Sequence, residues 1–203
     1  DWRRVSVNAA NKITMSRIVL SVIIMILLLF PFYEVGIKFP TYLINGNILV
    51  DLRYIIAGVL FIIASLTDFF DGRVARKYNM VTDFGKMIDA ISDKLLTNSL
   101  LVILACNGMI SPVIAVVFVV RDIVVDSMKM IMGNKGRAVA AIGVAKVKTA
   151  TLMVGLALTL FYNLPFSLIN LRVSDFLLIV SAVLSVISAV KYYLMAKEYF
   201  VMK

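Results

Sequence analysis

Four aspartates within one short stretch of this chain could carry out metal-dependent chemistry. Asp68 and Asp71 are three residues apart, and Asp89 and Asp93 are four apart. In an α-helix, either spacing puts both side chains on one face. We expect the first helix to end near Asp71 and Gly72 to turn the chain at little steric cost. The two helices would then be antiparallel neighbours, and the two pairs could face each other.

Carboxylates brought together in this way repel one another unless cations lie between them. Ligation by oxygen alone suits Mg²⁺, Mn²⁺ or Ca²⁺. Four carboxylates are too many for one Mg²⁺, so we expect two divalent ions, about 3.5–4 Å apart, as in sites of phosphoryl transfer. Arg76 and the backbone near Gly72 and Gly85 could contact a phosphate. The alternative is a structural ion network between the aspartates and the cations among them, namely Arg73, Arg76, Lys86 and Lys94.

The composition predicts a polytopic membrane protein. Of 203 residues, 62% are hydrophobic, against roughly 45–50% in soluble domains. The chain has no histidine and one cysteine, Cys106, which excludes a disulfide framework, a Cys/His zinc site and a histidine base. The net charge of +9 comes from cations beside apolar spans. This placement indicates that the partner is an anionic membrane surface or a phosphate-bearing substrate, and we expect no binding of nucleic acid.

The elements that must position the aspartates are predicted to be membrane helices. Basic residues gather in alternate connections, so the positive-inside rule places both termini and the aspartates on the cytoplasmic side. Residues 1–17 form a basic segment, either a solvated tail or a short helix on the membrane surface. We therefore expect an all-α membrane domain over residues 18–203 with six transmembrane helices, at 18–33, 52–66, 84–105, 113–132, 147–162 and 173–195.

The aspartate stretch resembles the signature of a known family at every fixed position. Asp68-x2-Asp71-Gly72-x2-Ala75-Arg76-x8-Gly85-x3-Asp89-x3-Asp93 is similar to the motif of the CDP-alcohol phosphotransferases, six-helix membrane enzymes that make phospholipids. The resemblance implies that Asp68, Asp71 and Asp89 hold the metals. It implies that Asp93 touches the second metal and is the general base for the acceptor hydroxyl. Asp68, Gly72, Ala75, Arg76 and Gly85 would bind the CDP-diacylglycerol donor.

Two further segments bear on the acceptor. Residues 8–20 and 93–105 look like those of bacterial phosphatidylglycerophosphate synthases. This resemblance implies transfer of a phosphatidyl group from CDP-diacylglycerol to glycerol 3-phosphate, with release of CMP, at the cytoplasmic face of a bacterial plasma membrane. The acceptor phosphate needs cations and donors, for which the candidates are Thr14, Arg17, Arg121, Arg137, Lys146 and Lys148.

Alternatives to this assignment remain open. Arg121 could pair with Asp122 or Asp126, and the lysines could serve topology alone. Asp122, Asp126 and Lys129 of the fourth span depart from the pattern expected of the phosphatidylglycerophosphate synthases. The acceptor could therefore also be inositol phosphate, serine or phosphatidylglycerol. A cation transporter using the aspartates as an ion path and a catalytically silent scaffold are the other classes of function.

Small residues in the sixth span predict a close helix contact. Ser181, Ser185 and Ala189 recur every four residues, a spacing that lets helices approach closely. The contact could lie within one bundle or between protomers. Members of the family that the signature resembles are homodimers, so we expect a homodimer.

Overall fold

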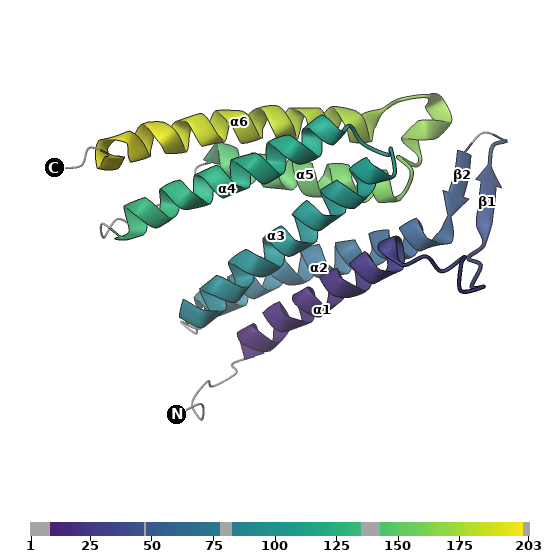
Figure 1. Ribbon diagram of the computed structural model, residues 1–203, viewed down its shortest axis with the longest axis horizontal. Helices are drawn as coiled ribbons and strands as arrows, with labels where there is room; N and C mark the ends of the chain where they lie inside the picture. The colour runs from purple at the N-terminus through teal and green to yellow at the C-terminus, as the bar shows by residue number, and fades with distance from the viewer. Residues whose placement is uncertain (1–8, 47, 78–82, 135–142, 201–203) are drawn as a thin grey trace. The chain divides into compact units, whose positions relative to one another are not determined.

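The computed structural model describes residues 9–46, 48–77, 83–134 and 143–200, with side chains left undescribed at 9–13, 68–77, 83–86, 134 and 198–200. These residues form six α-helices, one two-stranded sheet and a short 3₁₀ helix (Figure 1). The helices are α1 (Ala9–Leu29), α2 (Leu52–Lys77), α3 (Asp83–Cys106), α4 (Pro112–Asn134), α5 (Gly143–Leu160) and α6 (Val173–Phe200); the 3₁₀ helix η1 is Phe166–Ile169. The chain divides into a first unit, Asp1–Ile103 with Leu160–Tyr162, and a second unit, Leu104–Thr159 with Asn163–Lys203.

Each of the six predicted spans overlaps an α-helix, so the mostly helical fold is confirmed. Helix α1 begins at Ala9, so the second half of the predicted basic segment continues the first helix. It ends at Leu29, two residues before Pro31, so the predicted end of this span at residue 33 is wrong. A proline disfavours helical backbone in the residue that precedes it.

The predicted turn at Gly72 is wrong. Helix α2 continues through Asp68, Asp71 and Gly72 to Lys77. A glycine inside a helix costs only about 1 kcal/mol relative to alanine, so one glycine does not stop a helix that packing stabilises. The connection to α3 lies in residues 78–82, outside the described residues.

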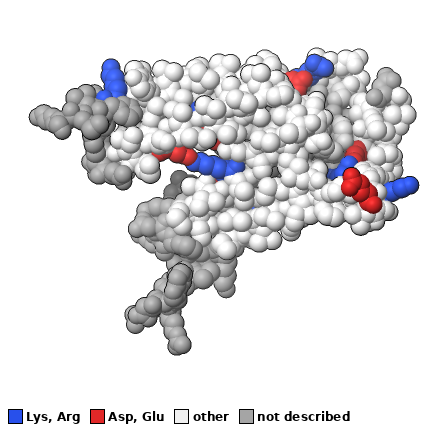
Figure 2. Space-filling view, viewed as in Figure 1, with Lys and Arg blue, Asp and Glu red and all other residues white. Residues whose placement is uncertain are grey.

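Two helices in the described part of the chain are long and apolar enough to cross a membrane. They are Gly143–Leu160 and Val173–Lys197, and shorter apolar stretches run over Thr14–Leu29 and Leu52–Thr67. The described charged side chains visible in Figure 2 form small groups separated by uncharged surface. Large apolar side chains such as Val19, Ile123 and Phe176 are more than half exposed, as expected for helices that face lipid.

In the first unit, α1 packs against α2, with Ile24, Ala57, Phe61 and Ala64 buried. The unit also contains a β-hairpin that the all-α prediction missed. Strands β1 (Thr41–Ile44) and β2 (Ile48–Asp51) pair antiparallel, with Ile44 opposite Ile48.

The signal for this hairpin was present in the sequence. Asn45 and Gly46 adopt positive φ angles of 52° and 74°, and Asn-Gly between apolar runs is a strong hairpin signal. The backbone N–H of Asp51 donates to the Tyr162 hydroxyl at 3.1 Å. This bond ties the end of β2 to the segment after α5.

In the second unit, α4 lies beside α6. Val125 and Met132 of α4 form a buried cluster with Tyr192 and Ala196 of α6. A turn precedes α4: Gly108 has a φ of 69°, and α4 begins at Pro112, a favoured first helical residue.

The small-residue face of α6 packs inside this unit. Ser181 and Ser185 are fully buried, and Ala189 packs against the α4–α6 cluster. A Cβ added to Gly155 of α5 would lie 3.0 Å from Leu178 of α6, so α5 and α6 also approach closely. Of the two contacts that the sequence left open for Ser181 and Ser185, the one within the chain is therefore present.

Candidate active site

Helix α3 presents two of the predicted metal-binding carboxylates on one face, and one of them, Asp93, is also the predicted general base. Asp89 and Asp93 are one turn apart in a continuous helix, as the sequence predicted. Their side chains are 57% and 45% exposed. Both carboxylates can therefore meet a ligand from solution while the helix holds their spacing.

Arg17 of α1 contacts both of these carboxylates. Its Nη1 lies 2.9 Å from Asp89 Oδ1, and its Nη2 lies 3.6 Å from Asp93 Oδ1. The arginine side chain is only 1% exposed, and Ser21 donates a hydrogen bond to its backbone carbonyl at 2.8 Å. A buried guanidinium must be paired, so this contact fixes α1 against the face of α3 that carries the aspartates.

Thr14 lies one turn before Arg17 and is also buried. The structure thus brings Arg17, a predicted acceptor-binding residue, together with two residues of the aspartate signature. The remaining signature residues lie in α2 and at the start of α3, where the helices are described but the side chains are not: Asp68, Asp71, Gly72, Ala75, Arg76 and Gly85.

Across the described residues, no group of three or more acidic, histidine or cysteine side chains is placed to hold a metal ion. The described part of the predicted metal site is the pair Asp89 and Asp93. Their donors are carboxylate oxygens that are half exposed. This donor chemistry fits Mg²⁺ or Mn²⁺.

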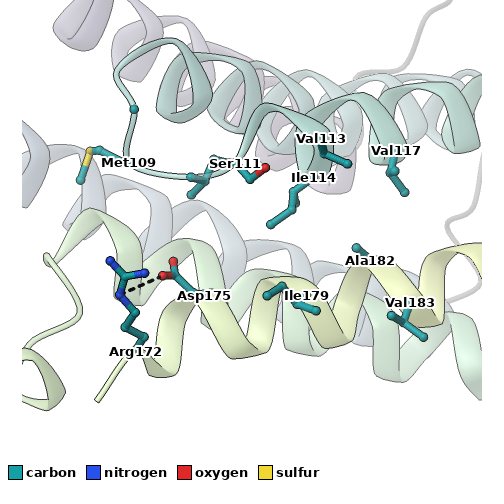
Figure 3. Close-up of a pocket in the computed structure, with 12 residues that line it drawn as sticks. Met109, Ser111, Val113, Ile114, Val117, Arg172, Asp175, Ile179, Ala182 and Val183 are labelled. Atoms are coloured by element: carbon teal, nitrogen blue, oxygen red, sulfur yellow. Dashed lines mark ion pairs between the residues drawn. The ribbon is translucent and has the colours of Figure 1, made fainter. Parts of the chain in front are cut away.

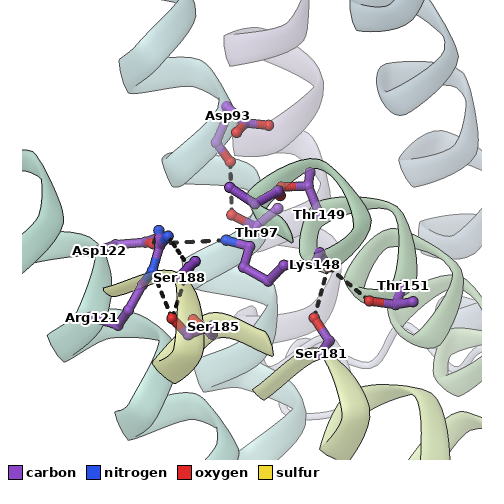
Figure 4. A network of polar contacts seen from close by, with 11 residues as sticks. Asp93, Thr97, Arg121, Asp122, Lys148, Thr149, Thr151, Ser181, Ser185 and Ser188 are labelled. Carbon is purple, nitrogen blue, oxygen red and sulfur yellow. Dashed lines mark hydrogen bonds and ion pairs between the residues drawn. The ribbon is translucent and has the colours of Figure 1, made fainter. Parts of the chain in front are cut away.

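A second group of charged residues lies among α4, α5 and α6 (Figure 4). Arg121 of α4 places Nη1 3.0 Å from Asp122 Oδ1, donates from Nη2 to Ser188 Oγ at 2.6 Å, and donates from Nε to the Ser185 carbonyl at 3.4 Å. Its side chain is 10% exposed. The pairing of Arg121 with Asp122, left open by the sequence, is therefore present.

Lys148 joins the same group from α5. Its Nζ lies 3.9 Å from Asp122 Oδ1 and 5.3 Å from the centre of the Phe118 ring. Ser181 of α6 donates to the Lys148 backbone carbonyl at 2.8 Å. Lys146 is exposed instead, and Arg137 lies outside the described residues.

Comparison with known proteins identifies the family of this chain. The family model for CDP-alcohol phosphatidyltransferases matches residues 7–194. The chain belongs to the CDP-alcohol phosphatidyltransferase family. This match confirms the family that the aspartate signature of α2 and α3 indicated.

Similar proteins carry one shared name, CDP-diacylglycerol–glycerol-3-phosphate 3-phosphatidyltransferase. The Bacillus subtilis protein is 35% identical over 168 residues, covering 83% of this chain and 84% of its own length. The Rickettsia felis protein is 32% identical over 155 residues, or 76% of each chain. The Mycoplasma genitalium protein is 38% identical over 115 residues, covering 57% of this chain and 49% of its own.

Sequence reasoning did not assign a site role to three residues of this chain. Asp122 contacts both cations of the second group, and Ser185 and Ser188 contact Arg121. The signal available was the placement of Ser181, Ser185 and Ser188 on one face of α6 at helical spacing. The sequence analysis interpreted Ser181, Ser185 and Ala189 as a packing face and gave Ser188 no role.

The second unit of the chain also contains a pocket of about 710 Å³ between the starts of α4 and α6 (Figure 3). Apolar side chains line most of it, among them Ile114, Val117 and Ile179. An ion pair between Arg172 and Asp175, with Nε and Oδ2 3.8 Å apart, borders it. No predicted site residue lines this pocket.

Proposed function

We propose that this enzyme transfers the phosphatidyl group of CDP-diacylglycerol to glycerol 3-phosphate, forming phosphatidylglycerophosphate and CMP. The observation that carries the proposal is the contact of buried Arg17 with Asp89 and Asp93. It places a cation suited to a phosphate beside the carboxylate that resembles the family's base. Glycerol 3-phosphate carries both groups that such a site recognises, a phosphate and a hydroxyl. The names of the similar bacterial proteins support the same acceptor.

In the proposed reaction, Asp93 accepts the proton of the acceptor hydroxyl. The hydroxyl oxygen forms a bond to the phosphorus that bears the diacylglycerol. The bond from this phosphorus to the oxygen bridging to CMP breaks, and CMP leaves with that oxygen. A carboxylate is the available base, because the chain has no histidine. Its half-exposed position leaves it accessible to a small soluble acceptor.

The other signature residues bind and orient the donor in this proposal. Gly72, Ala75, Arg76 and Gly85 surround the cytidine diphosphate group, together with Asp68. Two divalent ions, Mg²⁺ or Mn²⁺, would be held by Asp68, Asp71, Asp89 and Asp93 and would supply neutralisation of the pyrophosphate charge. Thr14, Arg17, Arg121, Lys148, Lys146 and Arg137 are the proposed contacts of the acceptor phosphate.

The proposed setting is a bacterial plasma membrane. All six helices span it, the active site and both termini face the cytoplasm, and two copies form a homodimer. The apolar helices and the alternation of basic connections support this topology. It would keep the acyl chains of the donor in the bilayer and its head group at the cytoplasmic surface.

The test is an acceptor panel with the purified full-length protein. CDP-diacylglycerol is supplied with Mg²⁺ or Mn²⁺ and, separately, glycerol 3-phosphate, inositol phosphate, inositol or serine, while CMP release and lipid product are measured by mass spectrometry. We expect glycerol 3-phosphate to be used best. Incorporation of inositol phosphate alone would refute the acceptor, and metal flux into liposomes without CMP release would refute the enzyme.

A further inference from the structure

A hydroxyl group on α6 is buried without a hydrogen bond. Ser185 is fully buried, and its Oγ has no hydrogen-bond partner in the part of the chain that the structure describes. Buried hydroxyls are normally paired, because leaving one unsatisfied is unfavourable. Its neighbours on α6 differ: Ser181 donates to the Lys148 carbonyl, and Ser188 to the Ser185 carbonyl. Ser185 therefore keeps a donor available beside the charged group of α4 and α5.

Ser188 fixes the direction of the nearby guanidinium. Its hydroxyl has one hydrogen, which it donates to the Ser185 carbonyl at 2.8 Å. The Ser188 oxygen can therefore act only as an acceptor toward Arg121, whose Nη2 donates to it at 2.6 Å. The Arg121 head is thus held from α6 by Ser188 and the Ser185 carbonyl, and from its own helix by Asp122.

One carboxylate oxygen connects two cations in this group. Asp122 Oδ1 lies 3.0 Å from Arg121 Nη1 and 3.9 Å from Lys148 Nζ. All three side chains are less than 15% exposed. Charges attract more strongly where water is excluded, so two fixed cations beside a buried hydroxyl donor favour an anion with several oxygen atoms.

We propose that Ser185 and Ser188 complete a phosphate-binding site with Arg121 and Lys148. Ser185 Oγ donates directly to a phosphate oxygen, and Ser188 is a positioning residue that holds the Arg121 guanidinium. The ligand class is a phosphomonoester, which under the proposed function is the acceptor's phosphate, so this inference rests on that function. An acceptor with an ammonium group and no phosphate would be repelled by Arg121 and Lys148.

The experiment measures steady-state kinetics and direct binding for single variants of the full-length enzyme. Ser185→Ala removes the proposed donor, Ser188→Ala removes the anchor of Arg121, and Ser188→Thr retains its hydroxyl. The matched control is Ser174→Ala, which makes the same change at a buried serine in the first turn of α6. The KM for glycerol 3-phosphate, the KM for CDP-diacylglycerol and kcat are measured, with calorimetric binding of glycerol 3-phosphate.

We expect Ser185→Ala to raise the KM and Kd for glycerol 3-phosphate about tenfold or more, the range for a hydrogen bond to a charged group. The KM for CDP-diacylglycerol should change less than twofold. Ser188→Ala should weaken acceptor binding similarly, and Ser188→Thr should restore most of it. Ser174→Ala should behave as the unmodified enzyme.

Several outcomes would overturn the inference. Unchanged acceptor binding in Ser185→Ala and Ser188→Ala would do so while leaving the proposed function intact. Equal losses for donor and acceptor, or for Ser174→Ala, would show a purely structural role. If the unmodified enzyme uses only inositol phosphate, the proposed acceptor fails, and the same variants measured with that phosphomonoester still decide the phosphate site. If it uses only acceptors without phosphate, both proposals fail.

Discussion

Replacing Arg17 by glutamine should uncouple α1 from the aspartate face of α3. The contact to Asp89 joins a nearly inaccessible guanidinium to a carboxylate that is 57% exposed. At 2.9 Å, two unit charges attract by about 1.4 kcal/mol in water and by about 6 kcal/mol at an effective dielectric constant of about 20. Because the carboxylate is more than half exposed, the lower part of this range applies.

We expect a coupling energy of about 2 kcal/mol between Arg17 and Asp89, within the range for hydrogen bonds to charged groups. This corresponds to roughly a 30-fold change in the unfolding equilibrium constant. The two single variants should lower the free energy of unfolding by different amounts. Asp89→Asn leaves a buried guanidinium with Asp93 3.6 Å away, whereas Arg17→Gln leaves two carboxylates that water can solvate.

The assay is a double-mutant cycle with Arg17→Gln, Asp89→Asn and the double variant. Unfolding is followed by far-ultraviolet circular dichroism during SDS titration of the enzyme in mixed micelles, with EDTA present so that divalent ions do not occupy the carboxylates. The control is the same cycle on Arg172 and Asp175, an exposed pair at 3.8 Å, for which we expect about 0–1 kcal/mol. A coupling energy for Arg17 and Asp89 no larger than that of the control would refute the reasoning.

Three further predictions concern the chemistry and the packing. Asp93→Asn should lower kcat by about 100-fold or more, the usual contribution of a general base, while Asp175→Asn, which changes an acidic residue of the α6 ion pair, should leave the rate of CMP release unchanged. Chelation of divalent ions should abolish CMP release, and added Mg²⁺ or Mn²⁺ should restore it; activity that persists in EDTA would contradict the proposed metal requirement. Gly58→Ala should lower the midpoint of unfolding, because its Cβ would lie 2.9 Å from the Phe161 ring and overpacking costs about 1–3 kcal/mol. Gly133→Ala, with no described heavy atom within 4 Å of its Cβ, should instead stabilise α4 by up to about 1 kcal/mol, so equal shifts for the two glycines would disprove this packing argument.

Much of the helical architecture was predictable from local pattern. The six apolar runs correspond to α1–α6 because apolar length and turn residues are properties of short segments. The hairpin of β1 and β2 was not predicted, although Asn45-Gly46 is a local signal for one.

Local pattern was less reliable at element ends. Gly72 lies inside α2, where the sequence predicted a turn. A single glycine changes the backbone free energy by only about 1 kcal/mol, which packing along a 26-residue helix exceeds. The turn chemistry of one residue therefore does not decide where such a helix stops.

The sequence by itself determined the family and the helical pairing of Asp89 with Asp93, because a fixed spacing within one helix sets which side chains share a face. Only the tertiary structure brought Arg17 to Asp89, 72 positions further along the chain, and to its neighbour Asp93. It alone joined Arg121 to Ser188 and Lys148 to Asp122. A basic residue near a membrane helix has the same sequence pattern whether it sets the orientation of the helix in the membrane or forms a buried ion pair. Its partner is decided by which helices pack together, and that depends on the side chains of all of them.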